Sequence, residues 1–73
     1  MNYTPHMVLT KNNTKLFIST RSHGHGKDLR ETAERIARRV DGRLFVENPI
    51  KRRYVMKNGE IAPWSRRWLE IKL

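Results

Sequence analysis

One segment of this chain has a regular hydrophobic period, and it predicts a helix near the middle of the sequence. The apolar stripe recurs at i, i+4, i+7, i+8 and i+11 in Leu29, Ala33, Ile36, Ala37 and Val40. Asp28 is suited to cap the N-terminus, and Glu31 three residues later completes a capping box. Asp41-Gly42 supplies the stop, with Gly42 available for the left-handed position after the last turn.

The segment before this helix predicts a β-hairpin. Residues 7–10 and 16–20 are short runs rich in β-formers, and Asn12-Asn13 between them is a turn signal because asparagine tolerates a positive φ. Residues 21–26, Arg-Ser-His-Gly-His-Gly, read as a loop that leads to the helix.

The segment after the helix predicts further strands. Residues 43–47 form the first, which Asn48-Pro49 ends because proline lacks a backbone donor. Residues 50–56 form the next, followed by a type I′ turn at Asn58-Gly59 and a short return at 61–62. The tail, residues 68–73, alternates as a half-buried strand does. Together the elements predict an α+β fold, ββ-α-ββ(β), with a small antiparallel sheet packed against one amphipathic helix.

The length and composition set the scale of this fold. Seventy-three residues make one domain, residues 1–73, with residues 1–6 expected to be flexible because no pattern anchors them. The chain has no cysteine, no apolar run near the roughly 18 residues that cross a bilayer, and no signal-peptide pattern. These features predict a protein without membrane contact, located in the cytoplasm or in a host's cytoplasm. We further expect a monomer and no cofactor.

The net charge of +9 is concentrated at the two ends of the chain. Residues 1–27 carry four basic groups and no acid, residues 28–47 carry five of each, and residues 48–73 carry seven basic groups against two acids. A small domain with such self-repulsion is typical of proteins with a polyanionic partner. Because the helix is charge-neutral, we expect it to serve as scaffold, and we expect the flanks to bind.

The candidate binding residues combine basic side chains with aromatic ones. They are Lys51, Arg52, Arg53, Lys57, Trp64, Arg66 and Arg67 in the C-terminal third, with Arg21 and Lys27 before the helix. Aromatic rings interleaved with arginines stack on nucleic-acid bases or anchor protein interfaces. Trp68 is predicted to lie in the core. No helix-turn-helix, zinc-finger or RNA-recognition signature is present, so any nucleic acid should meet the sheet and loops.

Three alternative site types are weaker. His23 and His25, with His6 as a third ligand, make a poor metal site, because no cysteine or nearby carboxylate supports them. Because of the same histidines, a small ribonuclease stays an alternative function. No cysteine nucleophile and no catalytic-triad spacing is present, so we expect that the protein is not an enzyme. Residues 24–27, Gly-His-Gly-Lys, resemble a phosphate cradle, but the Walker pattern fails at Arg21 and Asp28.

From MNYTPHMVLTKNNTKLF through PWSRRWLEIKL, the whole chain resembles small phage-encoded proteins that bind host RNA polymerase and regulate transcription. Length, basic character and the lack of cysteine agree. The resemblance implies a non-enzymatic regulator that binds near the N-terminus of the polymerase β′ subunit, inhibits promoter-dependent initiation and promotes antitermination beside nascent RNA. The alternative is a stand-alone, non-specific RNA- or DNA-binding module. The resemblance carries no site residues.

Overall fold

The computed structural model describes all 73 residues and contains the expected helix as α2, Leu29–Val40. Asp28 caps it, and its carboxylate accepts a hydrogen bond from the backbone N–H of Glu31 at 3.1 Å. The Glu31 side chain does not return a bond, so the capping box is only half formed. At the other end Asp41, rather than Gly42, takes the left-handed conformation, with φ 51°.

Gly42 is required for a different reason than the one expected. A Cβ atom at this position would lie 2.7 Å from the backbone oxygen of Leu9 and 3.1 Å from the Val8 side chain. The chain therefore needs glycine here because α2 and β3 join directly against β1. Close backbone approach, and not a positive φ, selects the residue.

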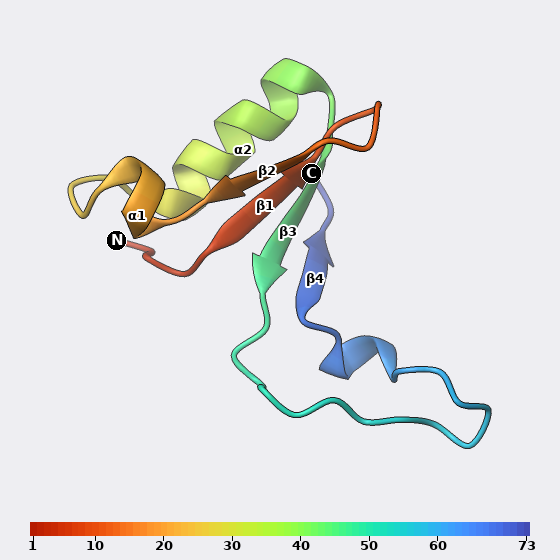
Figure 1. Ribbon diagram of the computed structural model, residues 1–73. Helices are drawn as coiled ribbons and strands as arrows, with labels where there is room; N and C mark the ends of the chain where they lie inside the picture. Colours follow the sequence, from red (N-terminus) through yellow and green to blue (C-terminus); the bar gives the residue numbers. More distant parts are fainter.

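Four strands form one antiparallel sheet in the order β2-β1-β3-β4. They are β1 (His6–Leu9), β2 (Lys15–Ile18), β3 (Arg43–Glu47) and β4 (Trp68–Ile71). The hairpin of β1 and β2 confirms the sequence prediction, and α2 lies across one face of the sheet (Figure 1). The α+β fold is therefore confirmed. None of the helices is long and apolar enough to cross a membrane.

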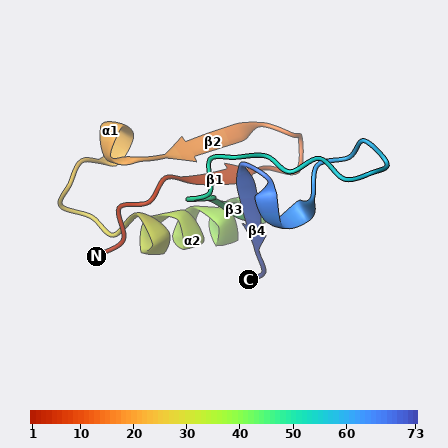
Figure 2. The ribbon, with the colours of Figure 1, turned by 90° about the horizontal axis from the view of Figure 1, so that it is seen from below.

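The core lies between α2 and the sheet. Its fully buried members are Val8, Ile18, Leu29, Ala33, Ala37 and Leu44. Ile36 and Val40 are only partly buried at its margin, so the centre of the helix stripe is the pair of alanines. Small residues there let the helix approach the strands closely, and Figure 2 shows α2 running close beneath the sheet.

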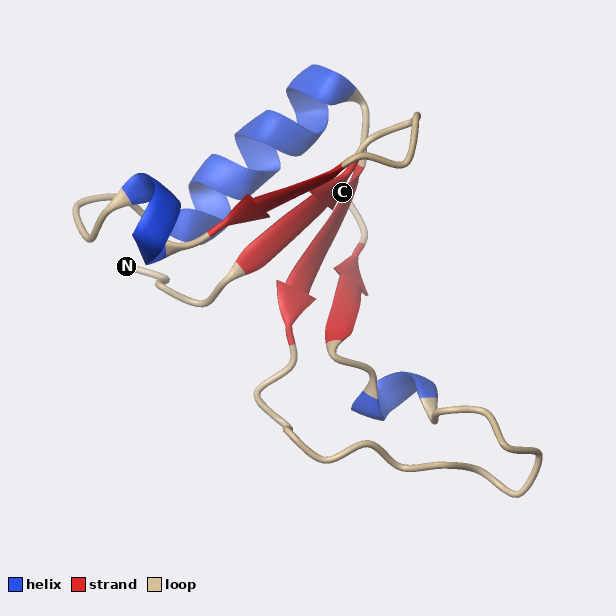
Figure 3. Ribbon diagram, in the orientation of Figure 1, coloured by secondary structure: helices blue, strands red, loops and turns tan.

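The predicted strand over residues 50–56 is wrong. Residues 48–67 leave the sheet and form an extended excursion, which we call the arm (Figure 3). Within it only Val55 and Ile61 form an isolated bridge, and Pro63–Ser65 form a short 3-10 helix, η1. At the tip only Gly59 has a positive φ, 85°, so the predicted type I′ turn, which needs two such residues, is also wrong.

One further difference lies near the N-terminus. Residues 20–23, expected to end a strand and begin a loop, form the short helix α1 (Thr20–His23). Residues 1–6 are tied to the fold, because the Asn2 carbonyl accepts from Leu29 N–H and the Pro5 carbonyl accepts from Glu47 N–H, at 2.8 and 3.0 Å. Their flexibility stays a prediction, although His6 already belongs to β1.

Candidate functional site

The arm holds most of the predicted binding residues, and Asn48 closes its base. The Asn48 side chain is buried, donates to the backbone oxygens of Trp64 and Arg66 at 2.9 Å each, and accepts from Ile50 N–H at 3.0 Å. One amide thus joins the outgoing and returning segments of the arm. The residue that ended β3 in the sequence prediction therefore also orders the excursion that follows.

Ser65 provides a second junction further along the arm. Its side chain is buried, and the hydroxyl accepts from Tyr54 N–H at 3.0 Å and donates to the Ala62 carbonyl at 3.0 Å. The Ala62 N–H donates to the Tyr54 carbonyl at 2.7 Å. These bonds tie the two sides of the arm together where it has almost no apolar core.

We expect Asn48→Ala to destabilise the protein by about 1–3 kcal/mol, because two backbone carbonyls lose their buried partners. Asn58→Ala is the matched control: Asn58 is exposed at the arm tip, where its side-chain oxygen accepts only from Glu60 N–H. Urea unfolding of both variants checks this. Equal stability of Asn48→Ala and the wild type would show that the amide does not order the arm.

The arm carries six basic side chains and one acid. The basic ones are Lys51, Arg52, Arg53, Lys57, Arg66 and Arg67, and the acid is Glu60. Of the six, only Lys51 and Arg67 approach a carboxylate, that of Glu47 at the end of β3, at 3.4 and 4.0 Å. Most of the arm's positive charge thus has no partner within the chain.

Apolar side chains stand among these charges. Six of them are exposed: Ile50, Tyr54, Val55, Met56, Ile61 and Trp64. Trp64 is 56% exposed and packs against Tyr54, with ring centroids 4.7 Å apart. An arm with exposed aromatic anchors inside a basic surround has the composition of a protein-docking element.

The other two predicted residues lie outside the arm, at two separate places. Arg21, on α1, borders a groove of about 500 Å³ that Arg67 also borders, so these two arginines face one hollow. Lys27 lies instead before α2, beside a second hollow of about 400 Å³. The structure therefore brings Arg21 to the C-terminal basic residues and leaves Lys27 separate.

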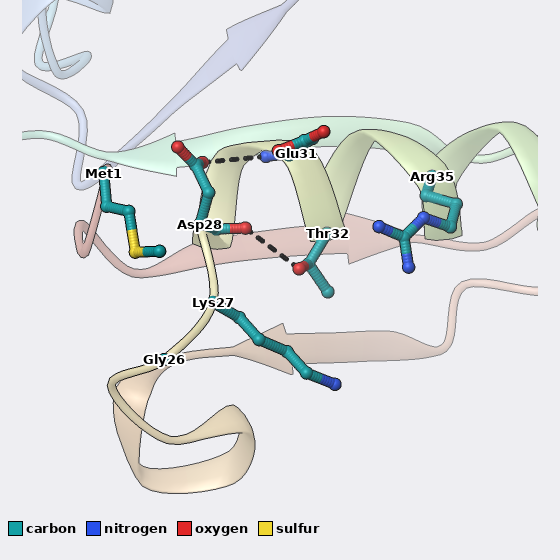
Figure 4. Close-up of a pocket in the computed structure, with 7 residues that line it drawn as sticks. All are labelled: Met1, Gly26, Lys27, Asp28, Glu31, Thr32 and Arg35. Carbon is teal, nitrogen blue, oxygen red and sulfur yellow. Dashed lines mark hydrogen bonds between the residues drawn. The ribbon is translucent and has the colours of Figure 1, made fainter.

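The phosphate-cradle alternative fails at the hollow beside Lys27 (Figure 4). Asp28 occupies the helix N-terminus with its own carboxylate, which bonds the N–H groups of Glu31 and Asn2. The hydrogen bond from Glu31 N–H lowers the pKa of Asp28, so the carboxylate stays charged. A phosphate would meet negative charge where it needs free N–H groups.

The sheet face turned away from α2, which we call the open face, carries aromatic residues that the sequence did not reveal as a group. The strand register places Met7, Phe17, Phe45 and Trp68 on it. Phe17 and Trp68 lie on opposite edge strands, yet their ring centroids are 6.0 Å apart. They close over the centre of the sheet, where Met7 is only 5% exposed. Trp68 is thus half-buried here and not a core residue.

Arginines accompany these rings. The Arg67 guanidinium lies 6.0 Å from the Trp68 ring centroid, and that of Arg43 lies 5.3 Å from the Phe45 centroid. Arg43 also bonds Glu70 on the neighbouring strand through two hydrogen bonds, the shorter of 2.6 Å, which lower the pKa of Glu70. Pairing of arginine with an aromatic ring is a cation–π arrangement.

The outer surface of α2 is only partly ion-paired. Its sequence places opposite charges four residues apart in three pairs, Arg30–Glu34, Glu31–Arg35 and Glu34–Arg38, and only Arg30–Glu34 forms an ion pair, at 2.9 Å. Glu34 turns toward Arg30, so Arg38 has no carboxylate partner, and neither does Arg35. The helix is formally neutral only together with its two capping residues, Asp28 and Asp41, and its outer arginines are exposed.

The three histidines do not assemble. His6 is buried in β1, His23 lies on α1, and His25 lies in the following loop against Tyr3. No group of three His, Asp or Glu side chains is arranged to hold a metal ion. His6 Nδ1 donates to the Thr4 carbonyl at 2.7 Å, which leaves the lone pair of Nε2 buried without a partner.

We expect the protein to lose stability as the pH falls below about 6.5. Burial lowers the pKa of His6, so the unfolded chain takes up a proton in a range where the folded chain does not. The lowered pKa values of Asp28, Asp41 and Glu70 act only at more acidic pH. Urea unfolding between pH 8 and 5 measures the loss, and His6→Gln should flatten it. An equal slope in both proteins would contradict the assignment to His6.

Comparisons with known proteins identify no relative: no family model, curated protein or solved structure matches this chain. The candidate site is therefore defined by the structure of this chain alone, and it consists of two surfaces. One is the basic arm, and the other is the open face with its groove between α1 and β4. Both lie at the end of the sheet where β3 ends and β4 begins.

Proposed function

We propose that this protein is a non-enzymatic transcription regulator that docks on bacterial RNA polymerase and places a basic surface beside nascent RNA. It inhibits promoter-dependent initiation and promotes antitermination. The resemblance to phage-encoded polymerase-binding proteins supplies the partner, with the N-terminal region of the β′ subunit as docking site and the cytoplasm of a bacterial host as location. The protein acts as a monomer and without a cofactor.

The observation that supports this proposal most is the arm. It extends beyond the sheet, its base is fixed by Asn48, and it carries exposed aromatic side chains within unpaired positive charge. Apolar anchors with a charged surround suit an acidic protein surface, because the charges speed encounter and the anchors supply affinity. Bare nucleic acid would use the charges but leave the exposed Val55 and Ile61 without a role.

Regulation by binding alone is physically sufficient for antitermination. A terminator acts when nascent RNA folds into a hairpin, and a positively charged body beside the emerging strand stabilises the unpaired form by its phosphate contacts. The same protein, bound to the polymerase before initiation, opposes the changes in the polymerase–promoter complex that initiation requires. No bond has to be made or broken by this chain.

Affinity capture tests the proposal. The tagged protein is incubated with bacterial lysate that has been treated with nuclease, so that nucleic acid cannot bridge it to other proteins. Retention of polymerase subunits, identified by mass spectrometry and lost in a charge-reversed arm variant, is the expected result. Loss of all polymerase after nuclease treatment would contradict docking and would favour the second candidate.

The second candidate is a stand-alone, non-specific RNA- or DNA-binding module. The open face favours it, because Phe17 and Trp68 present ring surfaces next to Arg67. Such a module needs no protein partner. Neither candidate function involves catalysis. The two differ in whether the arm binds a protein partner.

For either candidate we expect naked nucleic acid to bind weakly, without sequence preference and with strong salt dependence. The charges supply phosphate contacts, and no element offers a set of base-reading side chains. The log–log salt slope should be about −0.7 per contact for single strands. Fluorescence titrations at several salt concentrations measure it. Tight, sequence-selective binding to duplex DNA at about 0.3 M salt would contradict this.

A further inference from the structure

We propose that the open face of the sheet is a binding site for single-stranded nucleic acid, with one base stacking at the Phe17–Trp68 pair and the adjoining phosphates held by Arg21 and Arg67. This inference rests on the proposed function, in which nascent RNA passes beside the protein, and it names the surface that RNA would contact. Apart from Arg67, the last residue of the arm, the site lies outside the arm, which is assigned to the protein partner.

The rings of Phe17 and Trp68 are accessible to a ligand. Phe17 is 57% exposed although it belongs to a sheet strand, and its nearest ring, that of Trp68, is tilted by 47° at a centroid distance of 6.0 Å. A tilted pair at this distance leaves ring surface uncovered. Every base has an aromatic face, so an exposed ring on a sheet binds unpaired bases without regard to sequence.

The groove beside the pair has the size of a ligand site. It measures about 500 Å³, within the roughly 300–1,000 Å³ of small-molecule sites, and runs between α1 and β4 with Phe17 and Trp68 among its lining residues. Arg21 borders it from α1, and Arg67 borders it where the arm returns to the sheet. Phosphates on either side of a stacked base would thus meet a guanidinium.

The acids on this surface do not cancel the attraction. Glu47 also borders the groove, but Arg67 and Lys51 lie 4.0 and 3.4 Å from its carboxylate. Glu70, further along the open face, has Arg43 at 2.6 Å and Lys72 at 3.9 Å. Each carboxylate is flanked by two cations, so the surface carries net positive charge and matches a phosphate backbone.

Duplex nucleic acid does not fit this site. In a double helix the bases are stacked on each other and only their edges reach the grooves, so Phe17 would find no base face. Stacking at a sheet requires unpaired, splayed bases. The site therefore discriminates single strands from hairpins, which is the distinction that an antiterminator needs.

The test uses the full chain with Trp64→Phe, so that Trp68 is the sole tryptophan and can be excited selectively, and a ten-nucleotide oligouridine as probe. We expect the RNA to quench Trp68, and Phe17→Ala to weaken binding by about tenfold, since one stacked base contributes roughly that much or more. Phe17→Tyr should restore most of the affinity. Tyr3→Ala is the control, because Tyr3 is a similarly exposed ring that contacts His25 and not the pair.

The outcomes separate this inference from the proposed function. Equal affinity of Phe17→Ala and the wild type for the oligonucleotide, or equal affinity for single strand and duplex, would overturn the inference and leave polymerase docking intact. Dimerisation of the free protein that Phe17→Ala disrupts would also overturn it, because a second copy would then occupy the face. Quenching that Phe17→Ala weakens, in a protein that captures no polymerase, would uphold the site and reject the docking.

Discussion

Ala33→Asp is expected to abolish folding. Ala33 lies at the centre of the α2 surface that packs on the sheet and is fully buried. No basic side chain belongs to that core, so the new carboxylate would be buried without a partner. Such a charge costs several kcal/mol, against a total stability of about 5–15 kcal/mol for a typical domain, and a 73-residue chain lies at the lower end.

Thermal unfolding followed by circular dichroism measures this effect. Arg38→Ala is the control on the opposite side of the same helix: Arg38 is exposed and has no ion pair, so its loss should change stability by less than about 0.5 kcal/mol. Ile36→Asp should have a smaller effect than Ala33→Asp, because Ile36 is only partly buried. A cooperative transition of Ala33→Asp near that of the wild type would show that α2 does not pack as described.

Reversing three charges on the arm is expected to weaken polymerase binding by about tenfold or more without unfolding the protein. The variant changes Lys51, Arg52 and Arg53 to glutamate. All three lie outside the sheet and the core, where substitutions change stability by about 0.5 kcal/mol each or less. Charge complementarity raises association rates by factors of 10 to about 1,000, and reversal removes this advantage.

The matched control reverses three arginines of α2, namely Arg35, Arg38 and Arg39. They are exposed and have no ion pair, so the control changes the net charge equally on a different surface. Biolayer interferometry with purified polymerase compares the two variants. If the helix variant loses binding and the arm variant keeps it, the docking surface has been assigned to the wrong side of the molecule. Equal losses would indicate that only total charge matters.

Local sequence signals predicted the helix and the first hairpin well. The period from Leu29 to Val40 and the capping by Asp28 depend on residues a few positions apart, and the structure follows them. The end of α2 was less predictable, because Asp41 and Gly42 both suit a left-handed position. The approach of Gly42 to Leu9 decided the outcome, and that contact joins segments far apart in the sequence.

Local sequence signals predicted neither the arm nor the open face. Residues 50–56 have β-forming side chains, but their consecutive basic residues have no apolar face to bury, so they leave the sheet. Phe17 and Trp68 are aromatic residues that a small core would be expected to bury. Only the strand register shows that they share the face opposite α2. The basic residues of the arm could be identified from the sequence, because residues 48–73 contain too few acidic residues to pair with them.

The measurement that tests the central proposal most directly is transcription by purified bacterial RNA polymerase on a template with one promoter and one intrinsic terminator. Added before initiation, the protein is predicted to reduce the number of transcripts. Added to elongation complexes already past the promoter, it is predicted to raise read-through of the terminator, and the arm variant should do neither. Unchanged transcript number and unchanged read-through at saturating wild-type protein would contradict the account.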